Sequence, residues 1–138
     1  MADLLLDLIE YLQEEGLVTG DGIDAFRDHM PDSPDRLIAI QEYPGAGSST
    51  GVDTTRRSLQ VSVRSDSDNP SWAKEKCWEI YNLLDTPLDQ VHDLREHITM
   101  ISDRWMVISP RQTPFKSSID NNARVIYSFN MGVTTYRD

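Results

Sequence analysis

Two segments of this chain alternate apolar and polar side chains without a break, and no other feature constrains the fold as strongly. Residues 57–64 place three apolar side chains on one side, and residues 123–133 place four on one side. These side chains are Leu59, Val61, Val63, Val125, Tyr127, Phe129 and Met131. Such alternation is typical of strands with one buried face and one polar face. The chain is therefore expected to build a sheet that is covered on one face.

A helix over residues 3–15 is predicted to supply part of that cover. Asp3 can cap its start, and Gly16 stands where a left-handed residue ends a helix. Its inner stripe recurs at helical spacing and consists of Leu5, Leu8, Ile9 and Leu12. Its acidic side chains are expected in solvent, namely Asp7, Glu10 and Glu14.

A second helix is predicted from Pro70, a residue favoured at the first helical position, to about Leu84. Its inner stripe consists of Ala73, Cys77, Ile80, Tyr81 and Leu84. Two tryptophans flank the stripe, and Trp78 lies off its centre. Because an aromatic side chain at the margin of a core is well suited to a second contact, Trp78 is a candidate anchor between subunits.

The remaining elements are shorter strands separated by turn residues. We expect strands near residues 23–26 and over residues 36–43, the latter ended by Pro44. A tight hairpin is predicted to join residues 97–101 to residues 105–109, with prolines 110 and 114 breaking its second arm. The expected fold is α/β of the α+β type: one mixed, mainly antiparallel sheet of four to five strands with two helices packed on one face. Residues 1–138 are expected to form a single domain.

Residues 44–55 are rich in glycine, serine and threonine and are predicted to form a long loop. The glycines suggest a phosphate-binding loop, but no GxxxxGK[ST] pattern is present, and Arg56 and Arg57 open a strand, not a helix. Long loops in compact domains are usually functional or disordered. We therefore expect this loop to become ordered against a partner subunit.

The charge is unevenly placed along the chain, whose formal net charge is −10. Residues 1–53 hold 12 acidic and 2 basic residues, whereas residues 101–138 hold 3 acidic and 5 basic residues. An acidic balance argues against general DNA binding, because phosphate contacts need lysine and arginine. One hypothesis is that the acidic first third of one subunit meets the basic last third of a neighbour, with a salt-dependent affinity.

No motif for catalysis or metal binding is found. The single cysteine, Cys77, cannot form an internal disulfide and is expected to be a small buried residue. Asp21, Asp24 and Asp28 only vaguely resemble a calcium loop, since the closing glutamate is absent. We expect no enzyme activity, no cofactor and no metal. No secretory signal or membrane span is expected either, and the chain is assigned to a reducing cytosol where it is made.

Three groups of residues, in order, resemble the bacteriophage tail terminator (minor capsid) family of long-tailed phages. The first is residues 29–35 followed by the strand 37–40 and by Glu42-Tyr43. The second is residues 59–64 followed by residues 73–84. The third is residues 110–115, with Asp120 and Asn121 before the last strand. The resemblance covers nearly the whole chain, and the segment 45–55 departs from it.

The resemblance implies a structural virion protein. Such proteins form a six-fold ring at the head-proximal end of the tail tube, stop its polymerisation and provide the interface for head-tail joining. The implied partners are further copies of the chain in a hexameric ring, the tail tube protein and the head-tail connector proteins. DNA would pass through the lumen without specific binding, and no membrane is involved. The implied location is the neck region of the virion tail, after assembly in the host cytoplasm.

Two segments, residues 44–57 and 110–121, are predicted to contact these partners. Together with Trp78, the candidate contact residues are Tyr43, Arg56, Arg57, Arg111 and Phe115. Three alternatives remain open at this point: another phage neck protein for head completion or connection, a small cytosolic nucleotide-binding module that uses residues 45–57, and a generic dimerising domain.

Overall fold

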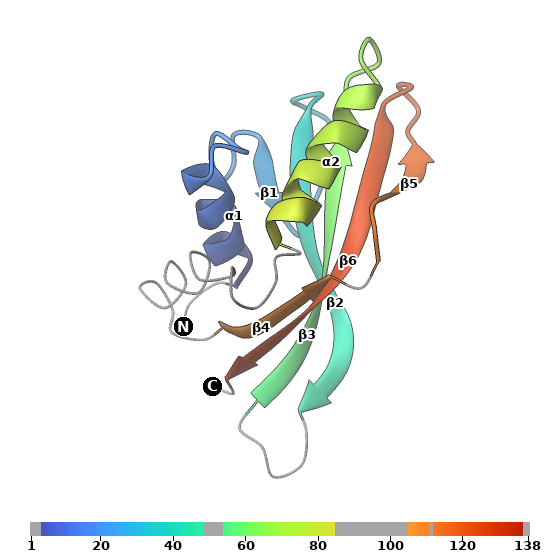
Figure 1. The fold of residues 1–138 in the computed structure, drawn as a ribbon. Helices are drawn as coiled ribbons and strands as arrows, with labels where there is room; N and C mark the ends of the chain where they lie inside the picture. Colours follow the sequence, from blue (N-terminus) through green and yellow to red (C-terminus); the bar gives the residue numbers. More distant parts are fainter. Residues whose placement is uncertain (1–3, 49–53, 85–104, 111, 137–138) are drawn as a thin grey trace.

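A computed structural model describes residues 4–48, 54–84, 105–110 and 112–136 (Figure 1). In chain order its elements are α1 (Leu4–Glu14), β1 (Ala25–Arg27), β2 (Leu37–Ser48), β3 (Thr54–Arg64), α2 (Ser71–Leu84), β4 (Trp105–Pro110), β5 (Phe115–Ile119) and β6 (Val125–Tyr136). The first arm of the predicted hairpin, residues 97–101, lies outside the described residues, and so does Arg111.

The strands form one sheet in the order β1-β2-β3-β6-β4, and β5 also pairs with β6. Only β1 and β2 are parallel, and the other pairs are antiparallel. β4 and β5 lie along successive stretches of β6, with Pro110 opposite Met131 and Phe115 opposite Ser128. The sheet is thus five strands wide, with one edge strand in two pieces. This arrangement confirms the predicted fold class.

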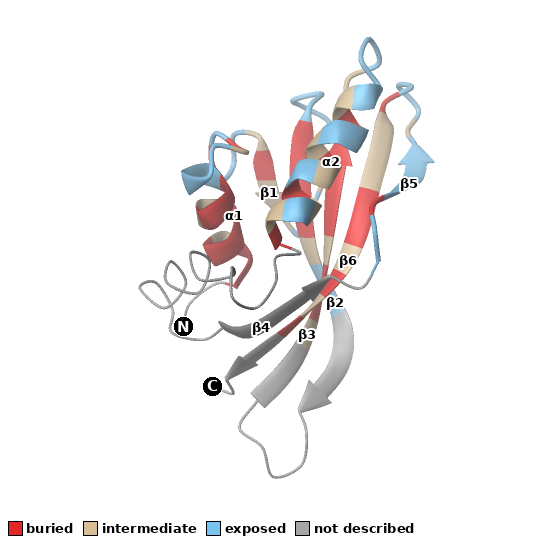
Figure 2. Ribbon diagram, in the orientation of Figure 1, coloured by how far each residue is buried: buried red, intermediate tan, exposed pale blue. Residues whose placement is uncertain are grey.

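The core lies between this sheet and the two helices, which cover one face of it (Figure 2). Val61 of β3 stands opposite Phe129 of β6, and both are fully buried. As predicted, the alternating apolar residues of both strands join the inner stripes of α1 and α2 in one cluster, with Tyr127 packed against it. Val125 is the exception, because it is only half-buried and lies outside this cluster. Burying one such side chain contributes roughly 1.5–3 kcal/mol, so this face supplies most of the driving force for folding.

The helix α1 ends as expected but buries more than expected. Gly16 takes a positive φ of 77°, and the N–H of Leu17 donates to the Leu12 carbonyl at 2.9 Å. The prediction that Asp7 faces solvent is wrong, because its exposed fraction is only 2 %. Asp7 stands three residues after Leu4 and four before Tyr11, so it shares a helix face with two buried side chains.

The prediction of a long loop over residues 44–55 is also wrong. β2 continues through Pro44 to Ser48, and β3 begins at Thr54, so most of this segment forms the two arms of a β-hairpin. A register shift between Tyr43 and Gly47 accommodates the proline, since a bulge frees a strand residue from the hydrogen-bonding ladder. In Figure 1 this hairpin extends beyond both helices. Two smaller differences are that β1 lies slightly later than predicted, and that β5 was not predicted.

Candidate interaction surfaces

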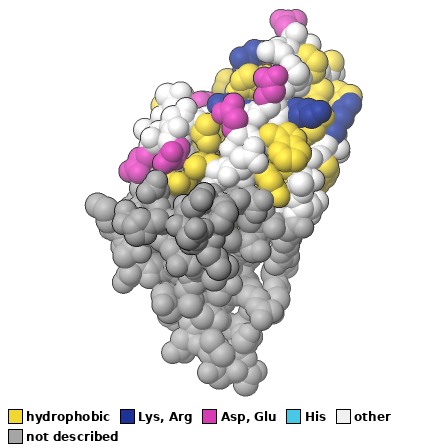
Figure 3. Space-filling view, viewed as in Figure 1, with side chains coloured by type: hydrophobic (Ala, Val, Ile, Leu, Met, Phe, Trp, Pro, Cys, Tyr) yellow, Lys and Arg dark blue, Asp and Glu magenta, His cyan; other side chains and the backbone are white. Residues whose placement is uncertain are grey.

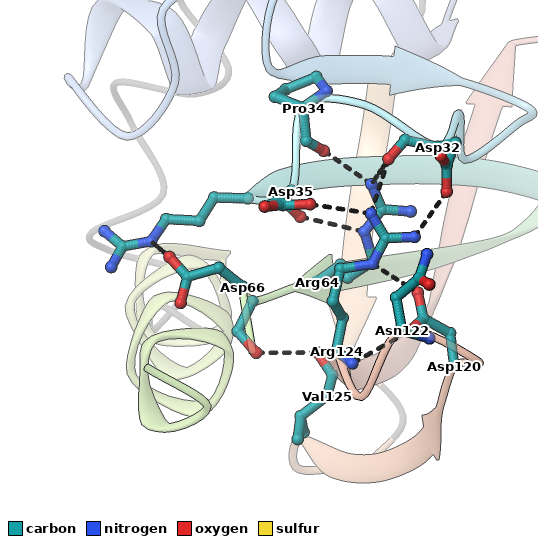
Figure 4. Close-up of polar contacts among 11 residues, drawn as sticks. Asp32, Pro34, Asp35, Arg64, Asp66, Asp120, Asn122, Arg124 and Val125 are labelled. Carbon is teal, nitrogen blue, oxygen red and sulfur yellow. Dashed lines mark hydrogen bonds and ion pairs between the residues drawn. The ribbon is translucent and has the colours of Figure 1, made fainter. Parts of the chain in front are cut away.

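Two arginine side chains are buried where β3 ends and β6 begins (Figure 4). Arg64, the last residue of β3, is only 3 % exposed. Its guanidinium donates to three backbone carbonyls of the preceding turn: from Nε to Asp35 at 3.0 Å, and from Nη2 to Pro34 at 2.6 Å and Asp32 at 3.1 Å. The side chain therefore holds the turn 32–35 against the sheet.

Arg124, which precedes β6, binds the same turn through its charged groups. Its Nη2 donates to Oδ1 of Asp32 at 2.8 Å, and its Nη1 donates to Oδ1 of Asp35 at 3.0 Å. Its Nε donates to Oδ2 of Asp120 at 2.7 Å. We call Arg64, Arg124, Asp32, Asp35 and Asp120 the arginine clamp. It joins two parts of the recognised motifs, residues 29–35 and Asp120, that are far apart in the sequence.

Within the arginine clamp, Arg124 and Asp120 stabilise each other's charges, whereas burial and Arg124 disfavour the charge of Arg64. Hydrogen bonds to Asp32 above all raise the pKa of Arg124, whereas burial and then the charge of Arg124 lower the pKa of Arg64. Burial alone would raise the pKa of Asp120, but the backbone N–H groups of Arg124 and Asn122 and the Arg124 guanidinium bring it below its ordinary value. Because these bonds lie within one chain, Arg124 is not available to an acidic neighbouring subunit. This weakens the hypothesis that the acidic first third of one subunit meets the basic last third of another.

The face of the sheet opposite the helices is polar. Gln41, Gln60 and Asn130 stand in register across β2, β3 and β6. Beside this row, the hydroxyl groups of Ser62 and Ser128 are 2.9 Å apart and buried, and Ser117 lies 3.0 Å from Ser128. The polar side of the alternating strands is therefore held by hydrogen bonds and not simply left in water.

A cavity of about 540 Å³ lies on this polar face. We call it the polar trough, and its lining residues are Asp28, Gln41, Glu42, Tyr43, Gln60 and Asn130. The Asn130 side chain is held in place by Gln112, because its Nδ2 donates to Oε1 of Gln112 at 3.1 Å. The lining residues that the structure describes hold two carboxylates, three carboxamides and a phenol, and no lysine or arginine is among them.

The two edges of the sheet are protected in different ways. On β1, the Ala25 carbonyl accepts a hydrogen bond from the N–H of Gly22 at 2.8 Å, and the Arg27 carbonyl lies 3.0 Å from Nδ1 of His29. The other edge consists of β4 and β5, and a register shift interrupts the ladder of each, between Trp105 and Val107 and between Lys116 and Ser118. All five side chains of β5 are exposed. Occupied carbonyls, an edge lysine and a bulge all disfavour pairing with another sheet.

A model of the bacteriophage tail terminator protein family matches residues 11–137. The chain belongs to this family. No curated protein matches the sequence. The family is structural and non-enzymatic, so the chain is a component of the virion tail, as the sequence motifs predicted. The buried arginine clamp is accordingly a structural element of this chain and not a catalytic site.

The candidate contact residues of this tail terminator lie on separate surfaces. Tyr43 lines the polar trough and is 36 % exposed, whereas Phe115 starts the β5 edge and is 37 % exposed. Arg57 is held within the subunit, since its Nε donates to Oε2 of Glu42 at 2.6 Å. The backbone of Arg56 pairs with Gly47 and Thr134.

Trp78 belongs to the helix-covered side. It is half-buried and packs edge to face on Tyr81, with ring centroids 5.4 Å apart, and Tyr81 packs in the same way on Phe129. Figure 3 shows hydrophobic side chains among charged ones on the surface around α2. Trp78 is thus tied to the core at one end and accessible at the other, which is the geometry expected of an anchor.

The described residues give no sign of a metal or redox site. No cluster of three histidine, cysteine or acidic residues in this part of the chain could hold a metal ion. Asp21 pairs with Arg27, Asp24 accepts the N–H groups of Thr19 and Gly20, and Asp28 accepts the N–H of Glu42. Cys77 is fully buried, which raises the pKa of its thiol to about 12. No helix in the described ranges is long and apolar enough to cross a membrane.

Proposed function

We propose that this tail terminator forms a six-fold ring on the head-proximal end of the tail tube. The ring stops polymerisation of the tube and offers its other side to the head-tail connector proteins. Residues 1–138 act as a single domain in this ring. The family match over residues 11–137 carries the proposal, because tail termination requires a protein that binds a growing end without extending it.

The surfaces of the subunit support a ring. A closed ring needs two different, complementary surfaces on each subunit, whereas a two-fold dimer needs one self-complementary surface. The protected edges of β1 and β5 disfavour assembly by extending the sheet. The β2–β3 hairpin, the polar trough and the aromatic surface around Trp78 remain as distinct contact surfaces.

The charge supports passage of DNA through the ring. The chain carries a net charge of −10, and Arg27, Arg36, Arg57 and Arg124 are each paired with a carboxylate of the same chain. A surface with few available cations gives DNA little electrostatic affinity. Tyr43, Arg56, Trp78, Arg111 and Phe115 are proposed contacts with neighbouring subunits, the tube or the connector, and Arg57 supports them by fixing Glu42.

Assembly of tail tubes in vitro tests this proposal. Purified tail tube protein is allowed to polymerise with and without this chain, and tube length and tube ends are examined by negative-stain electron microscopy. We expect shorter tubes with a ring at one end. Unchanged tubes, together with binding of the chain to DNA-filled heads, would instead identify a head completion or connector protein.

A further inference from the structure

The polar trough and the β2–β3 hairpin are distinct parts of the subunit with related chemistry. We propose that the polar trough of one subunit binds the β2–β3 hairpin of a second copy of this chain. The proposal rests on the ring described above and names the contact that closes it. The bound elements are residues 44–48 of β2 and residues 54–56 of β3.

The chemistry of the trough favours a polypeptide over a nucleic acid. Carboxamides both donate and accept hydrogen bonds, so Gln41, Gln60 and Asn130 can pair with the N–H and C=O groups of an extended segment. Asp28 adds negative charge, whereas the Glu42 carboxylate is already paired with Arg57, and none of the lining residues that the structure describes is basic. A phosphate would be repelled by the Asp28 carboxylate, whereas a neutral or basic backbone-rich segment would find hydrogen-bond partners in the three carboxamides.

The sequence of the hairpin fits such a site. Residues 45–48 read Gly-Ala-Gly-Ser, so this arm of the hairpin has almost no side-chain bulk. Glycine within a strand often marks a place where another backbone approaches closely. The opposite arm carries Arg56. A small, polar hairpin with an arginine matches a trough that is lined by three carboxamides and the Asp28 carboxylate.

The hairpin and the trough lie on different surfaces of the subunit, as a head-to-tail contact in a ring requires. The hairpin extends beyond both helices in Figure 1, whereas the trough lies on the helix-free face of the sheet. Donor and receiver are therefore different surfaces, and repeating the contact joins subunits head to tail. Extension of the sheet is disfavoured at both edges, since the outward carbonyls of β1 are occupied and the ladders of β4 and β5 are interrupted by register shifts.

Cysteine cross-linking on tail tubes tests the contact. Ser48→Cys places a thiol on the hairpin, and Gln41→Cys places one in the trough. The native Cys77 does not interfere, because it is fully buried. With a short bismaleimide, we expect a mixture of the two variants to give a cross-linked dimer, and the double variant to give a ladder that stops at the closed ring. Each single variant alone gives no cross-link.

The matched control is Lys74→Cys combined with Ser48→Cys, because Lys74 is exposed on the outer side of α2. The proposal is overturned if the double variant still caps tail tubes but cross-links no more than this control. Loss of tube capping by the unmodified chain would instead refute the proposed function. The two failures are therefore distinguishable in one experiment.

Discussion

The two faces of the sheet are stabilised by different interactions. The helix-covered face packs fully buried apolar residues of β3 and β6 against α1 and α2. The helix-free face is held by hydrogen bonds: the buried hydroxyl pair Ser62–Ser128, the exposed pair Asn130–Gln112, and the arginine clamp at one end. Apolar burial is non-directional, whereas hydrogen bonds fix position. The first face therefore provides stability, and the second sets the shape of a surface open to partners.

The largest effect should come from the helix-covered face. Phe129→Ala removes a fully buried ring that also packs on Tyr81, and we expect a loss of about 3–5 kcal/mol in the free energy of unfolding in urea. The matched variant Asn130→Ala changes the adjacent residue on the other face and should cost about 1 kcal/mol. Equal losses would contradict the division between the faces.

The arginine clamp should come next. Arg124→Met keeps the length of the side chain but leaves Asp32, Asp35 and Asp120 without their shared cation. We expect a loss of about 2 kcal/mol by denaturant unfolding, because the carboxylates of Asp32 and Asp35 remain largely in solvent. Arg36→Met, which breaks the exposed pair with Asp66, should cost less than about 1 kcal/mol. A larger loss for Arg36→Met would contradict the buried role of Arg124.

The pH dependence of stability should report on the same clamp. The pKa of Asp120 is lowered in the folded protein, so its contribution to stability is complete above its ordinary pKa of about 3.9 and is lost as pH falls through the lower folded value. Asp120→Asn should therefore destabilise the protein at pH 7 and lessen the acid-induced loss of stability. Thermal melts from pH 7 to pH 2.5 measure the difference, with Glu75→Gln on the outer side of α2 as control. A difference between Asp120→Asn and wild type that does not change with pH would count against the clamp.

The smallest effect on stability, and the clearest on assembly, should come from exposed aromatic residues. Phe115→Ser and Tyr43→Ser should change the free energy of unfolding by less than about 0.5 kcal/mol, because both side chains are more than one-third exposed. Binding to tail-tube ends in a sedimentation assay should nevertheless fall. A stability loss as large as that of Arg124→Met would show that these residues hold the fold instead.

The sequence predicts the helix-covered face far better than the helix-free one. Alternation at Leu59, Val61 and Val63 identifies the core strands directly, because side-chain direction has a period of two residues. The same rule placed Arg64 on a polar face but could not show that the turn 32–35 covers it, since that contact joins distant segments. A sequence signal for the arginine clamp did exist, namely aspartates flanking Pro34 and the spacing from Asp120 to Arg124.

The rule that proline ends a strand also failed, in two places where pairing with a neighbouring strand overrides it. Pro44 ends a strand by its missing N–H, yet the bulge before Gly47 lets β2 continue beside β3. Pro114 argued against a strand, but β5 begins one residue later because β6 offers it a partner. The polar trough could not be foreseen for a similar reason, because it depends on the register between Gln41, Gln60 and Asn130.

The position of β6 in the chain order affects when the protein can fold during its synthesis. β6 pairs with β3, β4 and β5, and it is the last of the described elements. Until residues 125–136 leave the ribosome, β3 lacks one of its two neighbouring strands, and α2 lacks part of the sheet surface on which it packs. Folding is then a late event that closes a long stretch of chain at once. Nascent chains would therefore be unable to complete this sheet before their synthesis has passed β6.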